Sequence, residues 1–169
     1  MLEGIRKGQE SAYRELFRDY YRPLTVFALR YVNDLDQARD LVQDLFVHLY
    51  ENRAAIQINT SLRAYLYQSV RNRCLNYLDQ QLTRKQHQDK IRISALKETN
   101  LEAEIERNEL EHRIFQIVDK LPDQCKKIFL LNRVKGLRNE EIAQQLGISK
   151  RTVETQISKA LKVLKAKIQ

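Results

Sequence analysis

Apolar side chains recur every three or four residues along most of the chain, a spacing that places them on one face of a helix. In the first part of the chain these positions include Ala12, Leu16, Tyr20, Leu24, Phe27 and Tyr31. Pro23 interrupts the run. Because proline is well tolerated in the first turn of a helix, we expect one helix over 9–21 and a second that starts at Pro23. No strand-like alternation is sustained, and glycine and proline are scarce, so an all-α fold is predicted.

The next predicted helix, residues 35–52, is acidic on its outward face. Its apolar positions are Ala38, Leu41, Val42, Leu45 and Leu49, and Asp34 precedes it as the expected N-cap. The opposite face carries Asp36, Asp40, Asp44 and Glu51, with Arg39 as the only Lys or Arg. Such a face suits either solvent or a basic partner.

The following helix is basic on its outward face. The polar stretch 53–61, "RAAIQINTS", predicts a loop, and Thr60 or Ser61 can cap a helix that starts at Leu62. Its inward positions are Leu62, Leu66, Val70 and Cys74, and its outward positions include Arg63, Tyr67, Arg71 and Arg73. Cations interleaved with flat rings suit phosphates and unstacked bases.

From residue 83 the apolar periodicity fades, which indicates a linker between two small domains. This linker, 83–108, starts basic and ends acidic, so it is either a solvated tether or a segment that lies along a charged partner. We expect a four-helix domain over 1–82 and a second helical domain over 109–169, joined flexibly.

The second domain contains a predicted helix-turn-helix in "EEIAQQLGISKRTVETQISKAL", residues 140–161. Ala143 allows two helices to approach closely, Gly147 suits the turn, and Val153 packs the second helix on the first. Ser149 is placed to cap the second helix. Residues 149–167 hold six basic side chains and one acidic one, Glu154, which favours a recognition helix in the major groove of DNA.

Composition supports a nucleic-acid partner. The chain has 169 residues and a net charge of +8, a surplus that favours a polyanion. It holds no apolar run long enough to cross a membrane and no signal-peptide pattern, so a cytoplasmic protein is expected. Cys74 and Cys125 are far apart and are expected to be small buried apolar residues in a reducing compartment.

No local signature of catalysis occurs in the sequence. There is no metalloprotease histidine motif, cysteine pair, phosphate-binding glycine loop or nucleophile elbow. Asp40 and Asp44 alone lack the further oxygen ligands that a metal site needs. We therefore expect no catalytic site, metal, cofactor or small-molecule substrate. A helix-turn-helix repressor or activator and a nucleic-acid enzyme with an unrecognised site remain as alternatives.

Two segments carry a family resemblance. "YYRPLTVFALRYVNDLDQARDLVQDLFVHLYEN" with "SLRAYLYQSVRNRCLNYLDQ" resembles region 2 of bacterial sigma factors, and "LPDQCKKIFLLNRVKGLRNEEIAQQLGISKRTVETQISKALKVLK" resembles region 4. Two regions with only a short tether between them are similar to the extracytoplasmic-function (ECF) class, most closely its iron-citrate-type regulators. Family members commonly cap the first helix of the turn motif with Ser or Thr. This chain has Arg138 there, so we expect Asn139 to cap instead.

The resemblance implies an alternative sigma factor that binds core RNA polymerase and reads the −10 and −35 promoter elements. By position, the residues implied for the β′ clamp coiled coil are Asp40, Gln43, Asp44 and Val47. Those implied for the −10 element, including a pocket for a flipped base and promoter melting, are Asn59, Thr60, Ser61, Arg63, Tyr67, Arg71, Asn72 and Arg73. Those implied for the −35 element are Lys150, Arg151, Thr152, Thr155, Ser158 and Lys159. The β flap and an anti-sigma factor are further implied partners.

Overall fold

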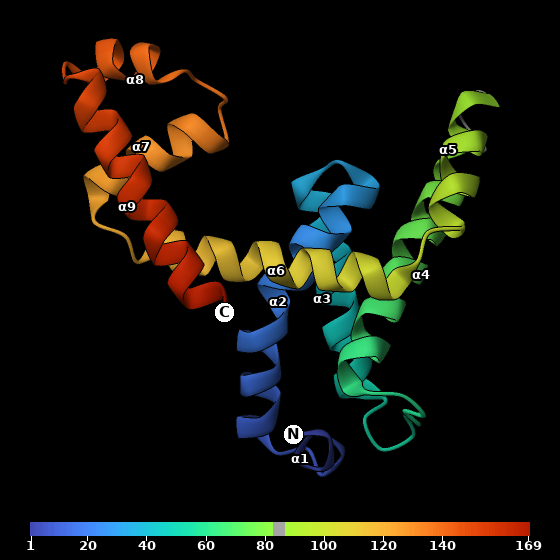
Figure 1. The fold of residues 1–169 in the computed structure, drawn as a ribbon. Helices are drawn as coiled ribbons and strands as arrows, with labels where there is room; N and C mark the ends of the chain where they lie inside the picture. The colour runs from blue at the N-terminus through green and yellow to red at the C-terminus, as the bar shows by residue number, and fades with distance from the viewer. Residues whose placement is uncertain (83–86) are drawn as a thin grey trace. The chain divides into compact units, whose positions relative to one another are not determined.

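The computed structural model describes residues 1–82 and 87–169, and within these ranges the chain folds into helices without any strand (Figure 1). It divides into two compact units, Met1–Glu109 and Leu110–Gln169. The helices are α1 Leu2–Arg6, α2 Glu10–Val32, α3 Leu35–Glu51, α4 Leu62–Leu82, α5 His87–Lys97, α6 Leu101–Asp119, α7 Asp123–Arg133, α8 Asn139–Leu146 and α9 Lys150–Ile168. The all-α prediction is confirmed.

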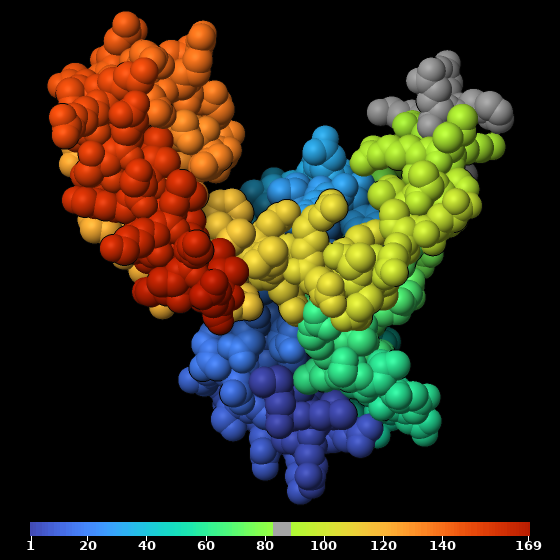
Figure 2. Space-filling model, in the orientation of Figure 1, coloured from blue at the N-terminus to red at the C-terminus, as the bar shows by residue number. Residues whose placement is uncertain are grey.

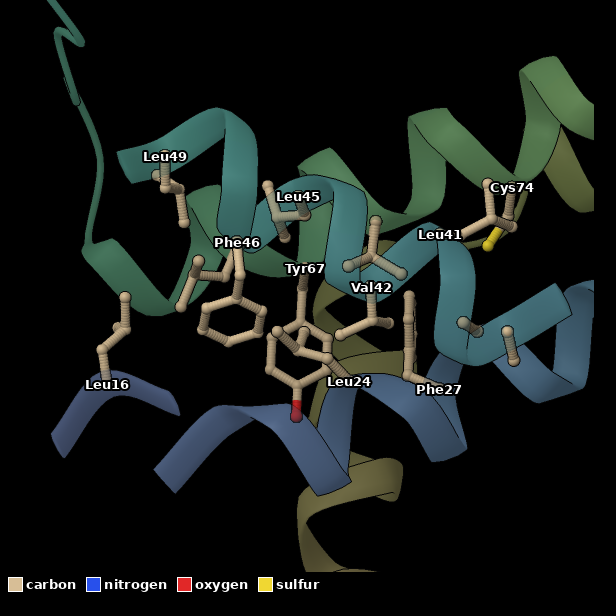
Figure 3. Packing of buried hydrophobic residues seen from close by; sticks show 14 of the residues in the cluster. Leu16, Leu24, Phe27, Leu41, Val42, Leu45, Phe46, Leu49, Tyr67 and Cys74 are labelled. Carbon is tan, nitrogen blue, oxygen red and sulfur yellow. The ribbon is translucent and has the colours of Figure 1, made fainter. Parts of the chain in front are cut away.

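The core of the first unit lies where α2, α3 and α4 pack together (Figure 3). Leu24 from α2, Leu45 from α3 and Leu66 from α4 are fully buried there. The predicted apolar face of α3 is confirmed, since Ala38, Leu41, Val42, Leu45 and Leu49 are all buried. Asp34 caps α3 as predicted, because its Oδ1 accepts a hydrogen bond from the backbone N–H of Gln37 at 2.9 Å.

The prediction that a helix ends before Pro23 is wrong, because α2 runs through the proline without a break. A proline inside a helix costs about 3 kcal/mol through its missing N–H and its ring. Leu16, Leu24 and Phe27 are buried on both sides of Pro23, and each such burial is worth about 1.5–3 kcal/mol. Tertiary packing along one face therefore keeps α2 continuous.

The predicted linker also differs from expectation over its described part, since α5 and the first half of α6 are helical and belong to the first unit. Residues 83–86 of that linker lie outside the described residues. Ile105 is fully buried in the first core, and Leu96 and Leu101 pack against it. Polar contacts add to these few apolar ones: Arg92 donates to the Tyr31 carbonyl at 3.2 Å, and Lys97 pairs with Asp79 at 2.9 Å. The spacing of apolar residues in the sequence does not predict such polar contacts.

The second unit has two adjoining apolar clusters. One joins the end of α6 to α7 and α9 through Val118, Leu121, Cys125, Phe129, Ala160 and Leu164. The other joins α7, α8 and α9 through Ile128, Leu131, Ile142, Ala143 and Val153. The predicted roles of Ala143 and Val153 in helix packing are confirmed by this second cluster.

Cys74 and Cys125 are free and buried, as predicted. Burial raises the pKa of the Cys74 thiol to about 12, which makes it a poor nucleophile. None of the helices in the described ranges is both long and apolar enough to cross a membrane.

Leu45→Ala is expected to lower the free energy of unfolding by about 2–5 kcal/mol, because it opens a cavity among α2, α3 and α4. Urea denaturation followed by circular dichroism measures this loss. Leu35→Ala, on the same helix but largely exposed, is the control, with an expected change within about 0.5 kcal/mol. Equal effects of the two substitutions would contradict this description of the core.

Candidate nucleic-acid interface

The outward face of α3 combines acidic and apolar side chains. Asp40, Gln43, Asp44 and Val47 are all exposed, because the apolar positions between them face α2 and α4. Gln43 donates to the Tyr21 hydroxyl of α2 at 3.4 Å, and Tyr21 stacks on Phe17 with ring centroids 4.5 Å apart. The acidic face therefore borders an aromatic surface that continues onto α2.

The loop before α4 is exposed at its end. Asn59, Thr60 and Ser61 all face solvent. Ser61 is the residue that caps α4, since its Oγ accepts the backbone N–H of Ala64 at 3.0 Å. Asn59 and Thr60 retain side chains that face outward from the first unit.

Two residues predicted to point outward from α4 are buried. Tyr67 has no exposed surface, and Arg71 is 7 % exposed. The outward placement predicted for them is wrong, because α4 is covered on two sides: by α2 and α3 on one, and by residues 96–109 on the other. Burial raises the pKa of Tyr67 to about 12, so its hydroxyl stays protonated and bonded.

The groups that bury these two side chains come from the segment expected to be a linker. The Tyr67 hydroxyl accepts a hydrogen bond from Asn108 Nδ2 at 3.2 Å, and the same amide donates to the Pro23 carbonyl at 2.9 Å. In Figure 3 the Tyr67 ring lies among the core side chains of α2 and α3. Arg71 Nη2 lies 3.0–3.1 Å from the carbonyl oxygens of Leu96, Lys97 and Thr99.

The other predicted −10 residues of α4 are less buried. Arg63 is half-buried and ion-paired with Glu102 and Glu109, whereas Asn72 is exposed and accepts a hydrogen bond from Gln68. Arg73 is half-buried on the same helix. The predicted −10 set is therefore divided between an exposed loop end and a covered helix.

The second unit forms the predicted helix-turn-helix from α8, a turn and α9. Gly147 ends α8 with a φ of 64°, the left-handed conformation that favours glycine. Ser149 caps α9, because its Oγ accepts the backbone N–H of Thr152 at 3.0 Å. The expected cap by Asn139 is wrong: α8 begins at Asn139 itself, and Glu141 reaches back to accept the backbone N–H of Arg138 at 2.7 Å.

The exposed side of α9 is basic. Arg151, Ser158 and Lys159 face solvent freely enough to contact a groove. The other three predicted residues also have local contacts: Lys150 pairs with Glu140 of α8, Thr152 bonds to the Ser149 hydroxyl, and Thr155 donates to the Arg151 carbonyl. Hydrogen bonding to Lys150 lowers the pKa of Glu140.

Comparison with known proteins gives the family. The model for sigma-70 region 2 matches residues 16–83, and the model for sigma-70 region 4 matches residues 111–164. The ECF RNA polymerase sigma-E factor of Haemophilus influenzae is 26 % identical over an alignment 178 positions long, which covers 100 % of this chain and 94 % of the relative. That of Escherichia coli K12 is 28 % identical, with coverage of 100 % and 93 %. The chain belongs to the ECF sigma factors.

As a sigma factor, the protein has its region 2 within the first unit and its region 4 within the second. The solved RsbN–BldN complex aligns over 98 % of this chain and 98 % of its own chain at 15 % identity and a TM-score of 0.42. The iron-citrate-type likeness stays a prediction.

Some residues that shape these surfaces were absent from the predicted sets. Phe17, Tyr21 and Tyr50 border the acidic face of α3, and Glu102, Asn108 and Glu109 contact α4 of this sigma factor. The acidic end of the predicted linker was the one sequence signal for the second group, since it indicated a charged partner.

Arg71→Ala is expected to lower the free energy of unfolding by about 1–3 kcal/mol, because it leaves the carbonyls of Leu96, Lys97 and Thr99 without their donor. Urea denaturation of the full chain measures this. Arg73→Ala removes the same side chain from the same helix and should change the value by less than about 0.5 kcal/mol. If the two variants unfold alike, Arg71 has no structural role.

Proposed function

We propose that this ECF sigma factor directs promoter-specific initiation by binding core RNA polymerase and promoter DNA, each with both of its units. The observation that carries the proposal is the pair of oppositely charged exposed surfaces in one chain: the acidic face of α3 and the basic face of α9. A repressor needs the second surface but not the first.

The polymerase contact is assigned to Asp40, Gln43, Asp44 and Val47 on α3, with the β′ clamp coiled coil as the partner. An exposed carboxylate face with an apolar border fits a basic helical partner, since charge steers the encounter and apolar area stabilises the complex. Region 4 is proposed to contact the β flap. The protein is proposed to act in the cytoplasm without catalysing a reaction itself, and an anti-sigma factor is proposed to regulate it.

Promoter recognition is divided between the two units. Asn59, Thr60 and Ser61 in the exposed loop end are proposed to receive a flipped base of the −10 element, with Arg63, Tyr67, Arg71, Asn72 and Arg73 of α4 along the single strand. Arg151, Ser158 and Lys159 are proposed to enter the major groove at the −35 element, with Lys150, Thr152 and Thr155 beside them.

Asp44→Arg and Lys159→Glu test this division of labour. Asp44→Arg is expected to weaken binding to labelled core polymerase by about tenfold, because it places like charges together, and to leave contacts of α9 with DNA unchanged. Lys159→Glu is expected to leave core binding unchanged and to lower the salt slope of holoenzyme binding to promoter DNA by about one.

Charge reversals outside the residues assigned to polymerase and to the −35 element are the controls. Glu10→Arg on α2 should not change core affinity, and Lys167→Glu near the end of α9 should not change the salt slope. If Asp44→Arg and Lys159→Glu lose the same single activity, the assignment of one partner to each surface is wrong.

A further inference from the structure

The basic side of α4 is occupied by groups from residues 96–109 of the same chain. Arg63 Nε lies 2.7 Å from a Glu109 carboxylate oxygen, and its Nη1 lies 3.0 Å from one of Glu102. The Arg63 side chain is only 30 % exposed as a result. Carboxylate oxygens take the position around a guanidinium that phosphate oxygens take in a nucleic-acid complex.

The same segment occupies the two side chains that follow Arg63 along this face of α4. Tyr67 and Arg71 lie one and two helical turns further on, and their polar groups bond to Asn108 and to the carbonyls of Leu96, Lys97 and Thr99. In Figure 2 the first half of α6, in yellow, lies against the blue and green helices of the first unit. A single strand of DNA and this segment cannot both contact the Arg63 and Arg71 guanidinium groups and the Tyr67 hydroxyl at the same time.

We propose that residues 96–109 are an intramolecular cover that competes with single-stranded DNA for Arg63, Arg71 and the Tyr67 hydroxyl. The proposal rests on the −10 role assigned above to α4. In the covered state the free protein keeps this part of its reading surface closed. Promoter DNA gains access when the cover leaves, so the cover is an autoinhibitory contact.

The contact between residues 96–109 and the rest of the first unit buries few apolar side chains and leaves polar atoms unpaired, as expected of a contact that can open. Ile105 is the one apolar side chain that the described part of the segment 96–109 buries completely, while Leu96 and Leu101 are only half-buried. Within the described residues, Arg71 Nε and Asn108 Oδ1 are buried without a hydrogen-bond partner, which is unfavourable. A pocket of about 360 Å³ also remains between α2 and the cover, lined by Phe27, Tyr31, Ala103 and Arg107 among others.

Competition makes a prediction that a purely structural contact does not. When only a fraction of the molecules is open, the apparent dissociation constant equals the intrinsic one divided by that fraction. Weakening the cover through its own acidic side chains therefore tightens DNA binding, although no DNA-binding residue has changed. A cover that never opens gives no such gain.

The test is the double substitution Glu102→Gln, Glu109→Gln in the full chain. Binding of a short fluorescent single-stranded DNA of mixed sequence is measured by anisotropy at fixed low salt. We expect about fivefold tighter binding than wild type, the effect of two weakened, partly exposed ion pairs. The control is Glu98→Gln, Glu106→Gln, which removes the same charge from exposed positions of the same segment and should change the affinity by less than about twofold.

If wild type and both double variants bind the DNA with equal affinity, the proposal that residues 96–109 compete with DNA is wrong, and the −10 role of α4 is unaffected. Failure of every form to bind single-stranded DNA, even with core polymerase present, overturns the −10 role and the cover with it. Hydrogen exchange gives an independent readout on unmodified protein: amides of residues 101–109 should exchange faster when the DNA is added, and unchanged exchange overturns the cover.

Discussion

The two-sided packing of α4 is the constraint on which the first unit depends. One side of this helix buries Leu66, Val70 and Cys74 against α2 and α3, and the other side is held by polar groups of residues 96–109. Tyr67 joins the two sides, because its ring lies in the apolar core and its hydroxyl bonds to Asn108. The Tyr67 hydroxyl cannot contact DNA unless residues 96–109 first move away from it.

Charge is distributed so that one chain can address two kinds of partner. The acidic face of α3 interrupts a strongly basic protein at a place where apolar side chains are also exposed, which is how protein partners are bound. The second unit presents basic side chains on the exposed side of α9, which is held on α8 by the turn at Gly147 and the small core around Val153. The acidic face of α3 and the basic face of α9 lie on separate compact units.

Features set by local chemistry could be predicted from the sequence. The caps at Asp34 and Ser149, the glycine turn and the apolar faces of α3 and α9 depend on residues within a few positions of each other. Features set by distant contacts could not. The continuity of α2 through Pro23 depends on packing along its whole length, and the hydrogen bonds that bury Arg71 and the Tyr67 hydroxyl come from residues 25 to 41 positions away.

The residues of the candidate site likewise divide into those whose exposure depends on local periodicity and those whose exposure depends on distant contacts. The predicted acidic face and most of the predicted basic face of α9 are exposed because helical periodicity alone decides which side of each helix is polar. The same periodicity gave a wrong prediction for Tyr67 and Arg71 of α4. Tyrosine and arginine are expected to face solvent, and only the segment 96–109, which packs on α4, changes that expectation. This segment is mostly polar and has too few regularly spaced apolar residues to predict that it packs on α4.

Run-off transcription with core RNA polymerase from the source bacterium on its genomic fragments, with and without this protein, is the most direct test of sigma activity. Sigma activity predicts transcripts with discrete start sites that appear only when the protein is present. Tight binding to duplex DNA with neither core association nor new transcripts would contradict it and would indicate a helix-turn-helix repressor instead.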